Sequence, residues 1–203
     1  MSLRIGITMR VTKSNNYYEL RDSISQDWIN YFNNFFPETK WILIPNSEEN
    51  ILRYIELWKI NAFIFSGGED FGLTKSRDIT ENVILKYALK KNLPILGICR
   101  GLQLIIKCFG GTIIKGNDKF IKRHLSTRHK IIYQNSNREI NSYHSFRIDK
   151  SNFPNNLKII ATDSVDKSIE AVQGKNILGL MWHPERERDI NWEKKLILNH
   201  FNI

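Results

Sequence analysis

Short apolar runs alternate with amphipathic stretches through the first half of the chain. Each run stops at glycine, proline or a polar residue, which is typical of a buried strand. We place these strands at residues 3–9, 41–44, 62–65 and 93–96. The stretches between them carry apolar side chains at helical spacing and predict helices at residues 24–36, 48–60 and 79–91. Repeated β-α-β alternation of this kind predicts a parallel sheet covered by helices on both faces.

The pattern changes after Gly110-Gly111, where apolar runs follow one another through turns instead of helices. A final apolar strand is followed by a helix at residues 192–201. We expect the strands of this half at residues 112–114, 131–134, 157–162, 169–172 and 176–182. No repeat or low-complexity linker divides the chain. The prediction is a single α/β domain over residues 1–203, with a mainly parallel sheet and an antiparallel addition in its C-terminal half.

The composition is that of a soluble globular protein, with 41% hydrophobic and 25% charged residues among 203. Its apolar runs are far shorter than the roughly 20 residues of a membrane-spanning helix. The N-terminal MSLRIGITMR also lacks the hydrophobic region of a signal peptide. Cys99 and Cys108 lie on one predicted helix, roughly 13 Å apart, whereas disulfide partners need Cα atoms within about 7 Å. We therefore expect a cytoplasmic protein with free thiols and no membrane association.

The chain is basic, since 30 Lys and Arg against 21 Asp and Glu give a net charge of +9. Residues 115–130 concentrate this charge, with six Lys and Arg against the single acid Asp118. Three interpretations stay open: a solvated loop, a site for an anionic small molecule, or a nucleic-acid surface. A single aromatic residue, Phe120, and the absence of a known binding motif argue against nucleic acid. A phosphate-bearing small molecule is the more economical functional interpretation.

The most informative segment is Gly97-Ile98-Cys99-Arg100-Gly101-Leu102-Gln103, between a predicted strand and a predicted helix at residues 102–109. Strand, G-x-C-x-G and helix in this order predict a nucleophile elbow with cysteine as the nucleophile. The sharp turn would strain the backbone of Cys99 and leave no room for a Cβ on either side. The N-terminus of the new helix favours a thiolate. The alternative is that Cys99 is merely a small buried hydrophobic residue.

A cysteine nucleophile needs a base, and the base needs a group that orients it. Among five histidines, His183 is favoured because it ends the last apolar strand, and ligands of a doubly wound sheet meet the carboxyl ends of strands. Glu185 lies two residues further on, so in an extended segment it can reach the imidazole. The other histidines are expected in the basic segment, in a polar turn-like segment at residues 141–145 and on the surface of the last helix: His124, His129, His144 and His200.

The tetrahedral intermediate of acyl transfer also needs donors for its oxyanion. Ser66-Gly67-Gly68 follows the predicted strand at 62–65, and its glycines let a backbone N–H approach a substrate. The N–H of Arg100, directly after the nucleophile, is the second expected donor. Taken alone, Gly67-Gly68 would be interpreted as an ordinary turn. Its combination with Cys99 and His183 favours an oxyanion hole.

Together, GICRGLQ, the upstream Gly-Gly loop and a strand ending in Trp182-His183-Pro184-Glu185 resemble the class I glutamine amidotransferase domain. The resemblance covers nearly the whole chain and implies a flavodoxin-like, doubly wound sheet. It implies a catalytic triad of Cys99, His183 and Glu185, with an oxyanion hole from Gly67, Gly68 and Arg100. It also implies that Gln103 contacts the glutamyl group of the substrate. The chemistry of such a triad needs no metal and no cofactor.

Further motifs are similar to the γ-glutamyl hydrolase branch of that family, the free-standing peptidase C26 type. They are Ile5-Gly6-Ile7-Thr8-Met9-Arg10, Ser66-Gly67-Gly68-Glu69-Asp70 and Asn141-Ser142-Tyr143-His144. The resemblance implies that the last of these lines the pocket and holds the α-amino or α-carboxylate end of the glutamyl group, through Asn141, Ser142, Tyr143 and His144. Glu170 matches a further polar position of this pocket, and Arg10 is another candidate for substrate binding.

The implied reaction is hydrolysis of a γ-glutamyl amide or of a P–N-linked glutamyl conjugate. His183, oriented by Glu185, deprotonates Cys99, whose thiolate attacks the γ-carbonyl, and water then releases glutamate from the thioester. Within this branch, a small lysine-rich hydrolase resembles the γ-glutamyl-CDP-amidate hydrolases of capsule phosphoramidate synthesis. The diphosphate of such an anionic substrate would be held by basic residues, with the candidates Lys115, Lys119, Lys122, Arg123, Arg10 and Arg21.

Three alternatives remain open. A γ-glutamyl-γ-aminobutyrate or polyamine hydrolase would release a cationic leaving group, which a basic pocket repels. A glutaminase subunit would deliver ammonia to a partner synthase, although the chain carries no fused acceptor-binding or ATP-binding part. A non-catalytic protein of this fold would use the basic segment for nucleic acid, but it would need none of the three triad residues.

Overall fold

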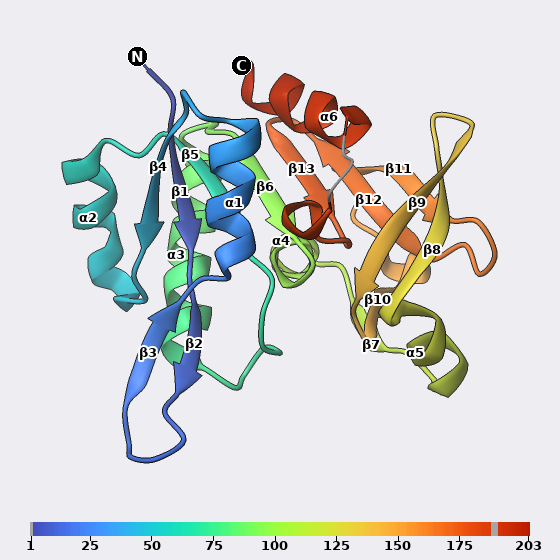
Figure 1. Ribbon diagram of the computed structural model, residues 1–203, viewed down its shortest axis with the longest axis horizontal. Coiled ribbons are helices and arrows are strands. Elements are labelled where there is room, and N and C mark those ends of the chain that lie inside the picture. The colour runs from blue at the N-terminus through green and yellow to red at the C-terminus, as the bar shows by residue number, and fades with distance from the viewer. Residues whose placement is uncertain (1, 188–190) are drawn as a thin grey trace.

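The structure, a computed structural model, describes residues 2–187 and 191–203. These residues form one large mixed sheet, two small two-stranded sheets and six α-helices (Figure 1). The helices are α1 Gln26–Phe35, α2 Ile51–Trp58, α3 Lys75–Lys90, α4 Arg100–Cys108, α5 Asp118–His124 and α6 Asn191–Phe201. The strands are β1 Arg4–Thr8, β2 Arg10–Lys13, β3 Leu20–Ser23, β4 Lys40–Ile44, β5 Ala62–Phe65, β6 Ile95–Ile98, β7 Ile113–Lys115, β8 Leu125–Tyr133, β9 Ser136–Tyr143, β10 Phe146–Ile148, β11 Lys158–Asp163, β12 Ile169–Gly174 and β13 Ile177–Leu180.

The large sheet has the strand order β4-β1-β5-β6-β13-β12-β11-β8-β9. Its first five strands run parallel to one another. From β13 onward each neighbouring pair is antiparallel. The predicted fold, a mainly parallel sheet with an antiparallel addition in the C-terminal half, is confirmed. None of the described helices combines the length and the apolar character that crossing a membrane requires.

Helices cover both faces of the parallel strands, and β5 shows how the sequence achieves this. Ala62 and Ile64 pack in the cluster that includes the apolar faces of α1 and α6. Phe63 and Phe65 pack on the opposite face, in the cluster that includes α2, α3 and α4. Because alternate side chains of such a strand are buried on both faces, its sequence is continuously apolar.

Three neighbouring parallel strands end at the same edge of the sheet. Phe65 of β5 lies opposite Gly97 of β6, and Ile98 of β6 lies opposite Leu180 of β13. The residues that follow these strands therefore meet at the carboxyl edge. They are Ser66-Gly67-Gly68 after β5, Cys99 after β6, and Met181-Trp182-His183 after β13.

Several polar segments form strands although they carry no hydrophobic pattern that predicts them. The hairpin β2–β3 is largely exposed on both faces, and β9 is exposed over its first four residues. The elbow strand is Ile95–Ile98, two residues later than expected, because Gly97 and Ile98 still pair with β13. These departures shift boundaries and add strands without changing the predicted topology.

The basic segment at 115–130 is not a solvated loop. It forms the end of β7, all of α5 and the first six residues of β8. Asn117 caps α5 by accepting a hydrogen bond from the Phe120 N–H at 3.0 Å, an arrangement that stabilises the first turn. His124 and His129, expected within an exposed loop, are buried, while His200 is half-buried on α6.

Candidate active site

Cys99 forms a nucleophile elbow between β6 and α4. Its backbone has φ 51° and ψ −104°, a conformation that a non-glycine residue adopts only under strain. The strain is held on both sides, since the Cys99 N–H donates to the Leu180 carbonyl at 2.7 Å and its carbonyl accepts from the Gln103 N–H at 3.1 Å. A Cβ on Gly101 would lie 2.1 Å from the Phe65 carbonyl oxygen, and one on Gly97 would lie 2.7 Å from the Gly101 backbone. Both flanking glycines are therefore required by close packing.

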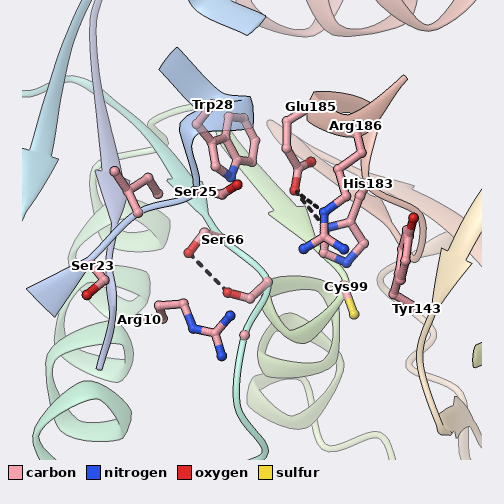
Figure 2. Close-up of a pocket in the computed structure, with 13 residues that line it drawn as sticks. Arg10, Ser23, Ser25, Trp28, Ser66, Cys99, Tyr143, His183, Glu185 and Arg186 are labelled. Carbon is pink, nitrogen blue, oxygen red and sulfur yellow. Dashed lines mark hydrogen bonds and ion pairs between the residues drawn. The ribbon is translucent and has the colours of Figure 1, made fainter. Parts of the chain in front are cut away.

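His183 and Glu185 form a buried pair beside the thiol (Figure 2). Nδ1 of His183 lies 2.6 Å from Oε1 of Glu185, so the carboxylate orients the ring and leaves Nε2 for the thiol. Burial lowers the pKa of His183, but the Glu185 charge and hydrogen bonds with Cys99 and Glu185 outweigh it and raise the pKa to about 10. Burial raises the pKa of Cys99, whereas the hydrogen bond and charge of His183, with a smaller contribution from the Arg100 N–H, lower it overall. The geometry favours a thiolate–imidazolium ion pair.

Asn141 fixes the backbone of His183 instead of lining a cavity. Its side-chain amide donates to the His183 carbonyl at 2.7 Å, and the His183 N–H donates back to Oδ1 at 2.9 Å. Its own backbone N–H donates to Glu187 at 2.9 Å. Because this reciprocal pair ties the end of β9 to the segment after β13, Asn141 positions the imidazole. A direct contact with substrate, which the resemblance implied, does not fit this buried placement.

The Gly67–Gly68 loop is oriented by Arg77, a residue that sequence reasoning missed. The fully buried guanidinium donates to the carbonyls of Ser66 and Gly67 at 2.9 and 3.1 Å. In a trans peptide the following N–H points the opposite way, so the Gly68 N–H faces away from Arg77. A Cβ on Gly67 would lie 2.5 Å from Cε1 of His183, and one on Gly68, at φ +151°, would lie 2.2 Å from Arg77. Only glycine fits at either position.

Arg77 belongs to a buried ionic network beneath the elbow. It donates to Glu81 at 2.9 Å and to Glu69 at 2.8 Å. Glu81 also accepts from the Thr8 hydroxyl at 2.7 Å and pairs with the side chain of Arg100. The Arg100 side chain thus points into the network, which leaves its backbone N–H, at the start of α4, as the group that faces the thiol. The only sequence signal for this network was the i,i+4 spacing of Arg77 and Glu81 on α3, a helix of low amphipathicity.

A cavity of about 200 Å³ opens beside Cys99 and His183. Arg10 lies across it from the thiol, and the guanidinium of Arg186 stacks 4.4 Å from the Tyr143 ring, which is itself perpendicular to His183 (Figure 2). A second cavity of about 450 Å³ contains Gln103, one turn into α4 from the nucleophile. The first cavity is lined by Arg10, Ser23, Ile24, Ser25, Trp28, Ser66, Gly67, Gly68, Cys99, Tyr143, His183, Glu185 and Arg186.

The remaining candidates lie away from these cavities. Ser142, His144 and Glu170 are buried and line neither one, contrary to the expectation for direct substrate contact. Among the basic candidates only Arg10 lines the cavity at Cys99. Arg123 makes a bidentate ion pair with Asp163, Arg21 pairs with Glu19, and the three lysines are exposed on or near α5: Lys115, Lys119 and Lys122.

Comparison with known proteins gives a consistent result. A family model described as glutamine amidotransferase class-I matches residues 17–201. The chain is 34% identical over 200 residues to the γ-glutamyl-CDP-amidate hydrolase of Campylobacter jejuni, covering 92% of each chain. It is 32% identical to the glutamine-hydrolyzing GMP synthase subunit of Methanococcus vannielii, over 70% of this chain and 72% of that one. A glutamine amidotransferase structure from Thermotoga maritima matches with a TM-score of 0.64 at 15% identity, covering 91% of this chain and 77% of the other.

Proposed function

The chain belongs to the class I glutamine amidotransferase family, and on that premise we propose that it hydrolyses a γ-glutamyl phosphoramidate, specifically γ-glutamyl-CDP-amidate. The reaction class is supported by the thiol of Cys99 on its strained elbow, with His183 and Glu185 on one side and the Gly67–Gly68 loop on the other. The substrate is supported by the similarity to the Campylobacter jejuni enzyme and by two arginines at the cavity beside the thiol.

In the first half-reaction the Cys99 thiolate attacks the γ-carbonyl carbon, and a tetrahedral oxyanion forms. The N–H groups of Gly68 and Arg100 are its donors, and both are fixed in advance by the Arg77–Glu81 network and by the start of α4. The imidazolium of His183 then gives its Nε2 proton to the departing nitrogen as the C–N bond breaks. The products of this step are a γ-glutamyl thioester on Cys99 and the free amidate.

In the second half-reaction His183 must act as a base towards water. Part of its raised pKa comes from the charge of Cys99 and the hydrogen bond to it. A thioester sulfur carries no charge, so this contribution disappears after acylation and the ring becomes a usable base. Water loses a proton to His183, the C–S bond breaks, and the thiolate–imidazolium pair returns as glutamate leaves.

The two cavities suggest how the substrate lies. Gln103, which the family resemblance assigns to the glutamyl group, lines the larger cavity, while His183 and the oxyanion loop line the smaller one. Since His183 must reach the leaving nitrogen, the leaving group belongs in the smaller cavity. There Arg10 and Arg186 offer guanidinium groups suited to a diphosphate.

A substrate panel tests the proposal. We expect kcat/KM for γ-glutamyl-CDP-amidate to exceed that for glutamine or γ-glutamyl-γ-aminobutyrate by about 100-fold or more, because only the first carries the diphosphate. Raised salt should increase KM for the amidate and leave KM for glutamine nearly unchanged. Equal or better turnover of glutamine would overturn the substrate assignment while leaving the reaction class intact.

A second candidate is a glutaminase subunit that supplies ammonia to a separate synthase. It is favoured by the similarity to the GMP synthase subunit of Methanococcus vannielii. It predicts weak glutamine hydrolysis by the protein alone and a large increase on addition of a synthase from the same cell. Full activity towards the amidate without any added protein excludes it.

A further inference from the structure

Three histidines and a glutamate meet inside the antiparallel half of the molecule. His124 ends α5, His129 lies on β8, His144 follows β9, and Glu170 lies on β12. All four are buried, with Glu170 and His124 at 0% exposure. One nitrogen from each ring and one carboxylate oxygen lie within 4.8 Å of one another. The four come from separate elements that adjoin at this end of the sheet (Figure 1).

The inward atoms of this cluster accept no hydrogen bond from any described residue. They are Nδ1 of His124, Nε2 of His129, Nε2 of His144 and Oε2 of Glu170. Buried polar atoms almost always have a hydrogen-bond partner in folded proteins, so four unpaired atoms that lie close together need a common explanation.

The hydrogen-bond partners of the outer ring nitrogens determine which nitrogen of each histidine carries the hydrogen and which carries a lone pair. His124 Nε2 lies 2.9 Å from Asp166, His129 Nδ1 lies 2.5 Å from Asp163, and His144 Nδ1 lies 2.8 Å from the Phe146 carbonyl. Each of these partners can only accept, so each outer nitrogen carries the hydrogen. In the neutral rings the inward nitrogens are then lone pairs, and with Glu170 they form a set of four ligand atoms around one point.

We propose that these four residues bind one divalent metal ion, and that the ion is Zn²⁺. Three imidazole nitrogens and a carboxylate oxygen are ligands that zinc accepts in tetrahedral geometry. Zinc bonds of about 2.0–2.2 Å place tetrahedral ligands about 3.4 Å apart. Nδ1 of His124 lies 3.6 Å from Oε1 of Glu170, and Nε2 of His144 and of His129 lie 3.5 and 3.9 Å from Oε2. Since the ligand atoms lie within 4.8 Å of one another, binding of the ion needs an inward movement of the rings.

The surroundings have the form of a structural zinc site. Each histidine is anchored by a carboxylate or carbonyl at its other nitrogen, the arrangement that orients zinc-bound imidazoles. Asp163 is held in turn by Arg123, and Glu170 accepts a hydrogen bond from Ser168 at 2.8 Å. The four ligands line neither the cavity at Cys99 nor the cavity at Gln103, so the ion would not meet substrate.

The site would tie the catalytic edge to the antiparallel strands. His144 directly follows Tyr143, whose ring lies against His183 at the rim of the cavity. The backbone N–H of His144 also donates to the His124 carbonyl at 3.1 Å. A metal bound by both histidines therefore fixes the segment that carries Tyr143. These residues act on catalysis through position, not through contact with the substrate.

Zinc content of the purified protein is the direct test. After loading with Zn²⁺ and desalting, elemental analysis should give one zinc per chain, and Co²⁺ in its place should give the intense visible absorption of a four-coordinate ion. His129→Gln and Glu170→Gln each lose a ligand, so the zinc content of each variant after desalting should be lower than that of the wild type by about tenfold or more. His200→Gln, a histidine outside the cluster, is the matched control and should keep its zinc.

Two further measurements keep the test decisive if a ligand variant fails to fold. Removal of metal from the wild type by chelation should lower its melting temperature, and added Zn²⁺ should restore it with one-to-one stoichiometry. Asp166→Asn, which keeps all four ligands, should weaken zinc binding about 10- to 100-fold. A wild type that neither retains zinc nor melts differently after chelation overturns the proposal, as does zinc kept by both ligand variants. Because no substrate is involved, this outcome is independent of the proposed hydrolase activity.

Discussion

The molecule contains two buried sites in which histidine meets a carboxylate, and they are built in opposite ways. At the carboxyl edge of the parallel strands, His183 and Glu185 are two residues apart and aim one free nitrogen at a thiol. In the antiparallel half, His124, His129 and His144 come from three elements and aim their free nitrogens at one another and at Glu170. The first arrangement is suited to moving a proton, whereas the second presents lone pairs suited to a cation.

This difference in construction explains why the sequence revealed the site at Cys99 but not the histidine cluster. Strand-turn-helix geometry and an H-x-E ending are local, so GICRG and Trp182-His183-Pro184-Glu185 could be interpreted from spacing alone. The four residues of the cluster are spread over residues 124–170 and carry no recognisable metal-binding spacing. They meet only because β8, β9, β11 and β12 pair, and β9 was not predicted from its polar sequence.

The largest effect should separate the two sites completely. Cys99→Ala removes the nucleophile, and members of such a triad act as a unit, so kcat should fall by about 10⁴-fold or more. The cluster does not involve Cys99, so zinc content and melting temperature should stay at the wild-type values. Steady-state kinetics with elemental analysis on one preparation measure both. Near-normal turnover in this variant would refute the assignment of the nucleophile.

Glu185→Gln tests the orienting carboxylate and should lower kcat by about 10²- to 10⁴-fold. The amide keeps the shape of the side chain but no longer stabilises the imidazolium. Because the raised pKa of His183 rests mainly on the Glu185 charge, that pKa should fall in the variant. An NMR titration of the His183 ring measures it directly, and an unchanged titration would contradict the role given to Glu185.

The pH profile of kcat/KM reports the thiolate–imidazolium pair. Attack requires Cys99 ionised and His183 protonated, a form that exists between the lowered pKa of the thiol and the raised pKa of the imidazole, about 10. The value of kcat/KM should fall roughly tenfold per pH unit below the pKa of the Cys99 thiol and above the pKa of the His183 imidazole. The charged groups around the pair are Glu185, Arg10 and Arg186. An acid limb at or above the ordinary pKa of cysteine would contradict the ion pair.

The smallest expected effect concerns the leaving group. Arg10→Gln removes a cavity cation that pairs only loosely with Glu69, at 3.9 Å, so the fold should be unaffected. KM for the γ-glutamyl-CDP-amidate should rise about tenfold, the order expected for one charge-assisted contact, while kcat changes little. Lys122→Gln on α5 is the matched control, because Lys122 is exposed and lines neither the cavity at Cys99 nor the cavity at Gln103. Equal effects of the two variants would show that overall charge, not a local contact, attracts the substrate.

The parallel half of the fold was predictable because its strands are buried on both faces and the helices α1, α2 and α4 are amphipathic, so hydrophobic pattern marks most of its elements. The hairpin β2–β3 and the start of β9 were not predictable, since neither buries a continuous apolar face. At the site, Cys99, His183 and the glycine loop each follow a buried strand, so local motifs mark their positions. Asn141 acts through tertiary hydrogen bonds that no local pattern encodes, and the i,i+4 spacing of Arg77 and Glu81 does not reveal their bonds to the glycine loop and to Arg100.

In the proposed reaction, Cys99 carries the γ-glutamyl group as a thioester. The direct measurement is the mass of the protein after rapid acid quenching of turnover with γ-glutamyl-CDP-amidate, alongside Cys99→Ala. We expect a mass increase of one γ-glutamyl group on the peptide that contains Cys99, which decays as glutamate appears and is absent from the variant. An unmodified Cys99 throughout turnover, together with turnover by Cys99→Ala, would contradict it.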